Sequence, residues 1–168
     1  MKIFIAILVS IIGFLTWQFV HTNRGETLSF PDDSGYVWKF KKGKEMTLSG
    51  RILPYPPGII GGSSVIKGSL QFCTEDAYRI FKEEYVKNKK SCQPFWKKYA
   101  KNFLLLTHSA AATRTMADLK PGKKVEMKFD YLRFIGTYSL AGKKMQNSWG
   151  WGGVHFLYVT EISVRAAG

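Results

Sequence analysis

Residues 124–131 read KVEMKFDY and hold the clearest strand pattern in the chain. Apolar side chains stand at every second position with polar or charged ones between them, as in a strand that buries one face. The apolar positions are Val125, Met127, Phe129 and Tyr131, and the polar ones are Lys124, Glu126, Lys128 and Asp130. The phase of this pattern slips at Leu132 and Phe134, which indicates a bulge or the start of another strand.

The sequence on both sides of this stretch predicts further strands. Apolar alternation recurs at 46–52 and at 66–72, and FLLLT at 103–107 is apolar enough for a buried strand. Residues 154–164 are largely apolar on both faces, which predicts a central strand. The stretch PYPPGIIGG at 54–62 holds three prolines and three glycines and therefore predicts a loop.

A helical segment is predicted midway along the chain. Thr74 can cap the first amides of a helix, and the two acids that follow it suit the positive end of the helix dipole. Helical spacing then runs to about Tyr85, and Pro94 opens a second short helix that extends through Lys101. Strands around an inserted helix fit a small, mainly antiparallel α+β domain, or a partly open barrel of the oligonucleotide/oligosaccharide-binding (OB) type.

The first 22 residues have a different composition from the rest. Residues 3–20, IFIAILVSIIGFLTWQFV, carry no charge, and as a helix they would span about 27 Å, close to the hydrocarbon thickness of a bilayer. A cleaved secretory signal is one alternative, although its apolar region is usually shorter, and a buried core helix is another. The sequence favours an uncleaved transmembrane helix within residues 1–22, a polar tether over 23–35 and a soluble α+β or β-barrel domain over 36–168.

Charges beside the apolar run bear on its orientation. Lys2 and the amino terminus precede the run, Arg24 follows it, and lysines begin only at Lys39. This asymmetry favours a short cytoplasmic N-terminus and an exported C-terminal domain, which would be periplasmic in a bacterium. The expected partners are therefore the membrane, through residues 3–20, and a protein of the cell envelope.

The two cysteines bracket the predicted helix. Export would favour a disulfide between Cys73 and Cys92, which needs their Cα atoms within about 7 Å. A helix over 75–87 would be about 18 Å long, and the five steps from Lys87 to Cys92 cover at most about 17 Å. A short helix therefore predicts the disulfide, and a long helix predicts two thiols or a bond to another chain.

The composition is that of one basic, folded domain. The chain has 168 residues, with 25 Lys and Arg against 12 Asp and Glu, and a net charge of +13. Lysines among aromatic rings can hold phosphates while the rings stack on sugars or bases, and lysines near a bilayer attract anionic headgroups. The alternative is a solvated basic face above aromatic core residues. The candidate binding residues are Trp96, Lys89, Lys90, Lys97 and Lys98, and smaller basic clusters stand at 39–44, 123–124 and 143–144.

A second candidate surface is the stretch NSWGWGG at 147–153. Its glycines allow a tight turn, and Trp149 and Trp151 can present flat apolar faces to a protein, a sugar ring or the bilayer interface. A turn whose tryptophans cover a small core is the alternative.

Motifs for catalysis, metals and cofactors are not found in the sequence. The three histidines, His21, His108 and His155, have no metal-ligand spacing, and no glycine-rich phosphate loop occurs. The sequence therefore predicts no metal and no cofactor. It favours a membrane-anchored, non-catalytic binding or assembly subunit of a cell-envelope complex. The alternatives are an exported OB-like domain that binds an anionic lipid or polysaccharide, with nucleic acid disfavoured by export, and an enzyme whose site only folding assembles.

Overall fold

The computed structural model describes residues 25–54, 64–88, 91–145 and 153–165. They form a small, mainly antiparallel β domain with a few helices. The strands are β1 (Thr27–Pro31), β2 (Tyr36–Ile52), β3 (Gly68–Cys73), β4 (Lys101–Leu106), β5 (Lys124–Ser139) and β6 (Val154–Arg165). The helical segments are α2 (Glu75–Ile80), η1 (Phe81–Val86), α3 (Gln93–Tyr99) and α4 (Ala110–Ala117).

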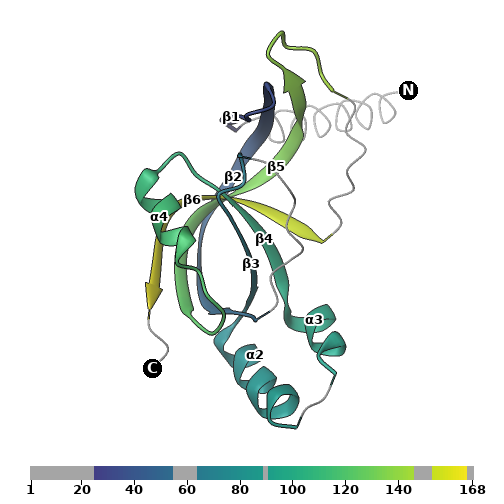
Figure 1. Ribbon diagram of the computed structural model, residues 1–168, viewed down its shortest axis with the longest axis vertical. Helices are drawn as coiled ribbons and strands as arrows, with labels where there is room; N and C mark the ends of the chain where they lie inside the picture. Colours follow the sequence, from purple (N-terminus) through teal and green to yellow (C-terminus); the bar gives the residue numbers. More distant parts are fainter. Residues whose placement is uncertain (1–24, 55–63, 89–90, 146–152, 166–168) are drawn as a thin grey trace, which may run out of the picture.

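Most of the described strands form a ring, in the order β2, β3, β4, β6, β5 and back to β2 (Figure 1). In this ring β4 and β6 run parallel, and the other paired strands are antiparallel. The remaining strand, β1, pairs with the N-terminal part of β2, from Thr27 opposite Lys41 to Pro31 opposite Val37. The position of β6 between β4 and β5 confirms the central strand predicted over 154–164.

The ring encloses the first of three cores. Val125, Met127 and Phe129 point into it, which confirms the buried face predicted from KVEMKFDY. The helix α4 adds Ala112 and Met116 to this core. This helix was not predicted from the sequence. The first core also contains Ile52, Leu70, Phe72, Phe103, Leu105, Leu157 and Val159.

A second core lies between β1 and the outer side of β4 and β6. Leu104 and Leu106 belong to it, while their neighbours on β4 point into the ring. From β1, Phe30 stacks on His108 with 4.4 Å between ring centroids. Residues 27–31 form a strand whose Leu28 and Phe30 are both buried in this core. The tether predicted over 23–35 is therefore wrong for this part of the chain. Each of these two side chains contributes roughly 1.5–3 kcal/mol on burial.

The change of pattern at Leu132 and Phe134 marks a second buried face of β5: both residues pack in the second core, on the side of the sheet opposite Tyr131. A bulge follows directly after Phe134. Lys39 pairs with Gly136 and Phe40 with Phe134, so Ile135 is an extra residue in β5. The strand continues through the bulge, and Phe134 packs against the second core at 5.3 Å from the ring of Phe40. A bulge is therefore present near the predicted place, at Ile135, but the apolar residues that suggested it are explained by the second core.

The described residues 74–88 and 91–100 form a helical lobe with a third core of its own. Thr74 caps α2 as predicted, since its Oγ1 accepts a hydrogen bond from the amide of Ala77 at 3.3 Å. Phe95 is fully buried in the lobe, with its ring 5.1 Å from that of Phe81 and 5.4 Å from that of Tyr85. Figure 1 places this lobe at one end of the ring and β1 at the other.

The structure has no disulfide between Cys73 and Cys92. The helix does not end early: η1 continues α2 to Val86, and a π-type hydrogen bond joins the amide of Lys87 to the carbonyl of Lys82 at 3.0 Å. This is the long helix for which the sequence predicts thiols, and the proposed disulfide is corrected accordingly. Burial, the main cause, and the charge of Glu75 raise the pKa of the Cys73 thiol to about 12.

The predicted transmembrane segment, residues 3–20, lies outside the described residues. Within the described ranges, none of the helices has both the length and the apolar character needed to cross a bilayer.

Candidate functional site

The described members of the predicted binding set lie on α3. The Trp96 ring packs inside the helical lobe, with its centroid 5.5 Å from those of Phe81 and Phe95. Lys97 and Lys98 are exposed at the surface of the same helix. The lobe thus presents ammonium groups to solvent but holds the tryptophan against its own core, so the predicted lysine and aromatic surface is only partly assembled. The other predicted residues, Lys89, Lys90, Trp149 and Trp151, lie outside the described residues.

The fold assembles a different basic surface on the β1-β2-β5 part of the sheet. Lys41 stands opposite Arg133 in the register of β2 and β5, and Lys39 stands opposite Gly136. The Lys39 ammonium lies 4.6 Å from the ring centroid of Tyr138, close enough for a cation–π contact.

Lys144, just beyond the end of β5, returns to the same surface. It forms an isolated β-bridge with Tyr138, and its side chain crosses Gly136. A Cβ at Gly136 would lie only 3.1 Å from the Lys144 Cε, so the absence of a side chain there makes room for the lysine stem. We call Lys39, Lys41, Arg133 and Lys144, together with Tyr138, the lysine face.

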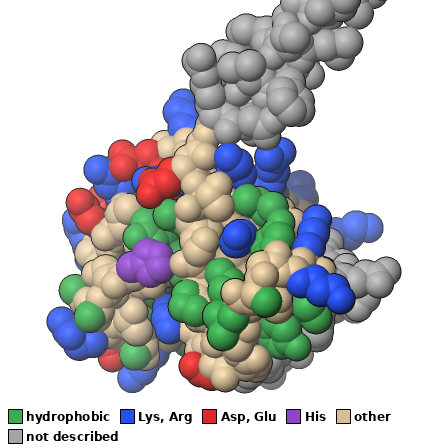
Figure 2. All heavy atoms as spheres, turned by 90° about the horizontal axis from the view of Figure 1, so that it is seen from above, with side chains coloured by type: hydrophobic (Ala, Val, Ile, Leu, Met, Phe, Trp, Pro, Cys, Tyr) green, Lys and Arg blue, Asp and Glu red, His purple; other side chains and the backbone are tan. Residues whose placement is uncertain are grey.

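The lysine face points away from the second core. On β1, Thr27 lies opposite Lys41 and Ser29 opposite Lys39, while the intervening Leu28 is buried on the other side. None of the described strand positions on this side of β1, β2 and β5 holds Asp or Glu. Figure 2, which looks onto this end of the molecule, shows Lys and Arg side chains mainly around the rim, with hydrophobic and uncharged groups between them and acidic side chains mainly toward one side.

The lysine face also lies where the described chain begins. The Lys41 Nζ donates a hydrogen bond to the carbonyl of Gly25 at 3.1 Å. The sequence shows basic residues at 39–44 and 143–144, but nothing in it indicates that Arg133 joins them. The only local signal is the alternation of Lys39 and Lys41 with a buried Phe40.

Two acidic residues, Asp32 and Asp33, stand in the turn between β1 and β2, where Asp32 accepts hydrogen bonds from the Tyr36 amide and the Trp38 indole. Glu26 and Asp130 belong to the other side of the sheet. The Lys42 Nζ lies 3.2 Å from the Asp130 Oδ2 and 3.7 Å from the Glu26 Oε2. The Asp130 side chain is only 5% exposed, so this ion pair is largely shielded from water on the carboxylate side. A hydrogen bond to Asp130, followed by the charge of that carboxylate, raises the pKa of Lys42.

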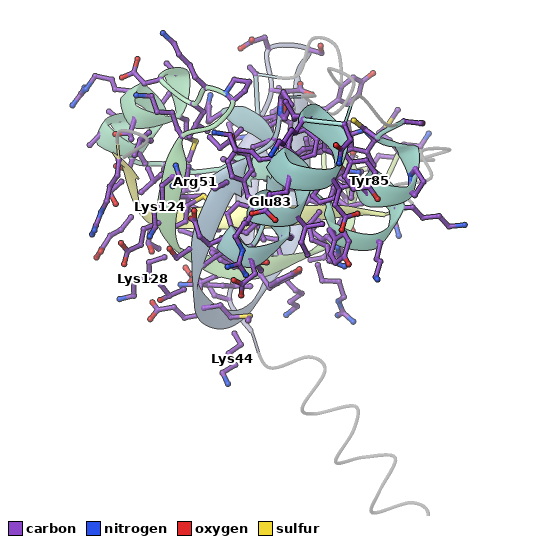
Figure 3. All side chains as sticks on the ribbon, turned by 90° about the horizontal axis from the view of Figure 1, so that it is seen from below. Lys44, Arg51, Glu83, Tyr85, Lys124 and Lys128 are labelled. Atoms are coloured by element: carbon purple, nitrogen blue, oxygen red, sulfur yellow. The ribbon has the colours of Figure 1, made fainter. Side chains whose placement is uncertain are left out.

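The flank of the ring is also rich in lysine, but acidic residues are interspersed among its cations. Figure 3 shows Lys44, Lys124 and Lys128 on the β2 and β5 side of the molecule, apart from Glu83 and Tyr85 of the lobe. Ion pairs join Lys128 to Glu45 at 3.4 Å and Arg165 to Glu126 at 3.0 Å. The lysine face is the better candidate for an anionic ligand, because no described strand position on its side of β1, β2 and β5 holds Asp or Glu.

An open cleft of about 580 Å³ separates the lobe from the turn before β5. Arg51 lies in it and is held by the Glu75 carboxylate at 2.9 and 3.0 Å and by the carbonyl of Gly122 at 3.1 Å. The ring of Tyr78 lies 5.6 Å from the Arg51 guanidinium. The Arg51 guanidinium therefore has its hydrogen-bond and ion-pair partners within the domain. Because Arg51 is on β2 while Glu75 and Tyr78 are on α2, these contacts join the ring to the lobe.

Two half-buried carboxamides with buried oxygen atoms lie on the outer side of β3 and β4. Gln71 and Asn102 are cross-strand neighbours, and the Oε1 of the first and the Oδ1 of the second find no hydrogen-bond donor in the structure. Gln71 accepts a hydrogen bond from the amide of Leu53, just before the undescribed residues 55–63. Asn102 pairs with Val154, just after the undescribed residues 146–152.

The pKa is raised at four described groups, which include Lys42 and Cys73. Hydrogen bonding to Tyr99 raises the pKa of Lys98, and burial raises the pKa of Tyr131. The pKa values of Lys42, Cys73, Lys98 and Tyr131 are therefore all raised further above neutral pH. In the described ranges no three His, Cys, Asp or Glu side chains come close enough to hold a metal ion.

Comparisons of the chain with protein families, with curated proteins and with solved structures found no match.

Proposed function

We propose that this chain is a membrane-anchored, non-catalytic binding or assembly subunit of the cell envelope, with an OB-like, partly open barrel as its exported domain. The strand order of the ring supports the barrel. Counted along the chain, the five ring strands are β2, β3, β4, β5 and β6. The third and the fifth of them, β4 and β6, pair in parallel, and the helix α4 connects the third to the fourth, β5. In OB barrels the connections between the first two and the last two strands carry ligand contacts. Here those connections are 53–67 and 140–153, and the second contains Trp149 and Trp151.

The observation that carries the proposal is the arrangement of the two ends. β1 lies at one end of the ring and the helical lobe at the other (Figure 1). Because the predicted anchor precedes β1 directly, the β1 end is the one nearest the bilayer. The lobe then projects away from the membrane, where a partner protein can reach it.

The helical lobe has the properties of a docking element. Its core, around Phe81 and Phe95, is separate from the core of the ring. Lys97 and Lys98 stand exposed on its outer helix and would suit an acidic surface on the partner.

The alternative function is direct binding of an anionic polymer or lipid headgroup. The lysine face favours it, because four cations and an aromatic ring share one side of a sheet with no acidic strand position among the described residues. This alternative is compatible with the first, since the lysine face and the lobe lie at different ends of the domain.

Membrane extraction and protease digestion test the proposal. We expect the full chain to stay with membranes at alkaline pH, which strips peripheral proteins. The domain should be digested from outside once any outer barrier is opened. Release into the soluble fraction would contradict the anchor, and protection until the inner membrane is breached would contradict export.

A charge reversal tests the lobe as the docking element. The double substitution Lys97→Glu and Lys98→Glu should reduce co-purification of other envelope subunits with the full chain by at least about tenfold, because one lost charge pair at an interface costs roughly 1.5 kcal/mol or more. Arg114→Glu with Lys120→Glu makes the same charge change at exposed positions outside the lobe and should leave co-purification unchanged. Equal recovery with both variants would exclude the lobe.

A further inference from the structure

We propose that the lysine face rests on the bilayer and binds anionic phospholipid headgroups, so that the β1 end of the domain lies flat on the membrane. The inference rests on the proposed function for the position of the anchor. It goes beyond that function by assigning a ligand to Lys39, Lys41, Arg133 and Lys144.

Chain connectivity places the lysine face within reach of headgroups. The predicted span ends at Val20, and the five steps from there to Gly25 cover at most about 17 Å. Gly25 accepts a hydrogen bond from Lys41 itself. The face is therefore tied to the point at which the chain would leave the membrane.

Charge favours the same partner. On the lysine face the cations come from β2, from β5 and from the segment after β5, and the register holds them on one side of the sheet. The carboxylates of Glu26 and Asp130 are engaged by Lys42, on the opposite side. Lysines within a Debye length of an anionic leaflet are attracted to it, and lysine suits such a diffuse surface well because it acts as a point charge.

Exposed apolar side chains at this end favour a lipid over a polysaccharide. Leu140, directly after β5, is 75% exposed. Tyr138 lies on the lysine face itself, whereas Tyr36, 36% exposed, lies at the same end on the opposite side of β2. A Cβ at Gly35 would lie 3.9 Å from the Leu140 side chain, so the two hairpin ends are close together. Aliphatic and tyrosine side chains beside lysines are typical of a surface that meets the bilayer interface.

Lysine acylation of the full chain in nanodiscs tests the inference. One set of discs contains phosphatidylcholine alone, and the other contains phosphatidylcholine with phosphatidylglycerol. In the anionic discs Lys39, Lys41 and Lys144 should react about fivefold more slowly than in the neutral discs, relative to Lys97 on the distant lobe. High salt should remove the difference, because it shortens the Debye length.

A matched pair of variants identifies the residues responsible. Lys39→Gln, Lys41→Gln and Lys144→Gln together should abolish the enrichment of phosphatidylglycerol that stays with the full chain on detergent extraction. Lys97→Gln, Lys98→Gln and Lys120→Gln remove the same charge elsewhere and should retain the enrichment. Equal loss in both variants would show a net-charge effect and would overturn the assignment.

The outcomes separate this inference from the proposed function. If the chain enters the discs but the three lysines react equally in both, the anchor stands and the lysine face does not bind lipid. If the chain does not enter, yet anionic discs still slow the three lysines, the anchor is wrong and the lipid surface stands. Protection by a soluble anionic polysaccharide, with none by anionic discs, would overturn the lipid as ligand.

Discussion

Substitution of Phe95 by alanine should unfold the helical lobe and leave the ring folded. The Phe95 ring is fully buried and lies within 5.5 Å, between centroids, of Phe81, Tyr85, Trp96 and Tyr99. Replacing a buried phenylalanine by alanine costs about 3–5 kcal/mol through lost contacts and the cavity left behind. A core as small as that of the lobe has little further stability to absorb this loss.

Hydrogen exchange followed by mass spectrometry measures the effect segment by segment. Amides of 75–99 should lose protection in Phe95→Ala, while those of β4, β5 and β6 keep theirs, because these strands belong to the other two cores. Lys97→Ala, on the same helix but exposed, should change protection by less than about 0.5 kcal/mol. Loss of protection spread evenly over the ring would show that lobe and ring form one cooperative unit.

Replacement of Lys42 by methionine should destabilise the whole domain. It would leave the Asp130 carboxylate, 5% exposed, without its ion-pair partner at 3.2 Å. Breaking a buried pair costs about 3–5 kcal/mol, and the 31% exposure of Lys42 lowers our expectation to about 2–3 kcal/mol. Lys97→Met removes an exposed ammonium from α3 and should leave the melting temperature almost unchanged.

The cost of Lys42→Met should depend on pH in a defined direction. Hydrogen bonding to Asp130 raises the pKa of Lys42 above its ordinary value of 10.5 in the folded protein. Its contribution to stability is therefore fully present below 10.5 and is lost as pH rises through the folded pKa. The difference in melting temperature between wild type and variant should be constant from neutral pH to about pH 10 and then shrink. A difference that grows above pH 10 would contradict this ion pair.

Local patterns in the sequence predicted most of the elements but not how they pair. The alternation at 125–131 and the Thr74 cap are confirmed, because each rests on neighbours within a few residues. β1 was missed although Leu28 and Phe30 alternate with polar residues, since two apolar positions are too few to outweigh the turn residues beside them. For α4, the signal was Ser109 before an alanine-rich run; its Oγ accepts the amide of Ala112 at 3.2 Å.

The candidate site depended on contacts that no local pattern contains. The pairing of β2 with β5 places Lys39 opposite Gly136 and Lys41 opposite Arg133, and the members of each pair are about 90 to 100 residues apart along the chain. The sequence located basic clusters but could not say which ones share a side of the sheet. It also could not show that Trp96 points into the lobe, because the helix follows Pro94 for less than two turns and both faces hold aromatic residues.

The distance of each end of the domain from the bilayer tests the central claim most directly. Nitroxide labels at Thr27→Cys and Lys98→Cys, each in a Cys92→Ser background where Cys73 is buried, would be placed in the full chain in nanodiscs that contain nickel-chelating lipid. Relaxation of the nitroxide by surface nickel falls steeply with distance. The account predicts strong relaxation at residue 27 on β1 and little at residue 98 on the lobe. Equal relaxation at both sites, or stronger relaxation at the lobe, would contradict it.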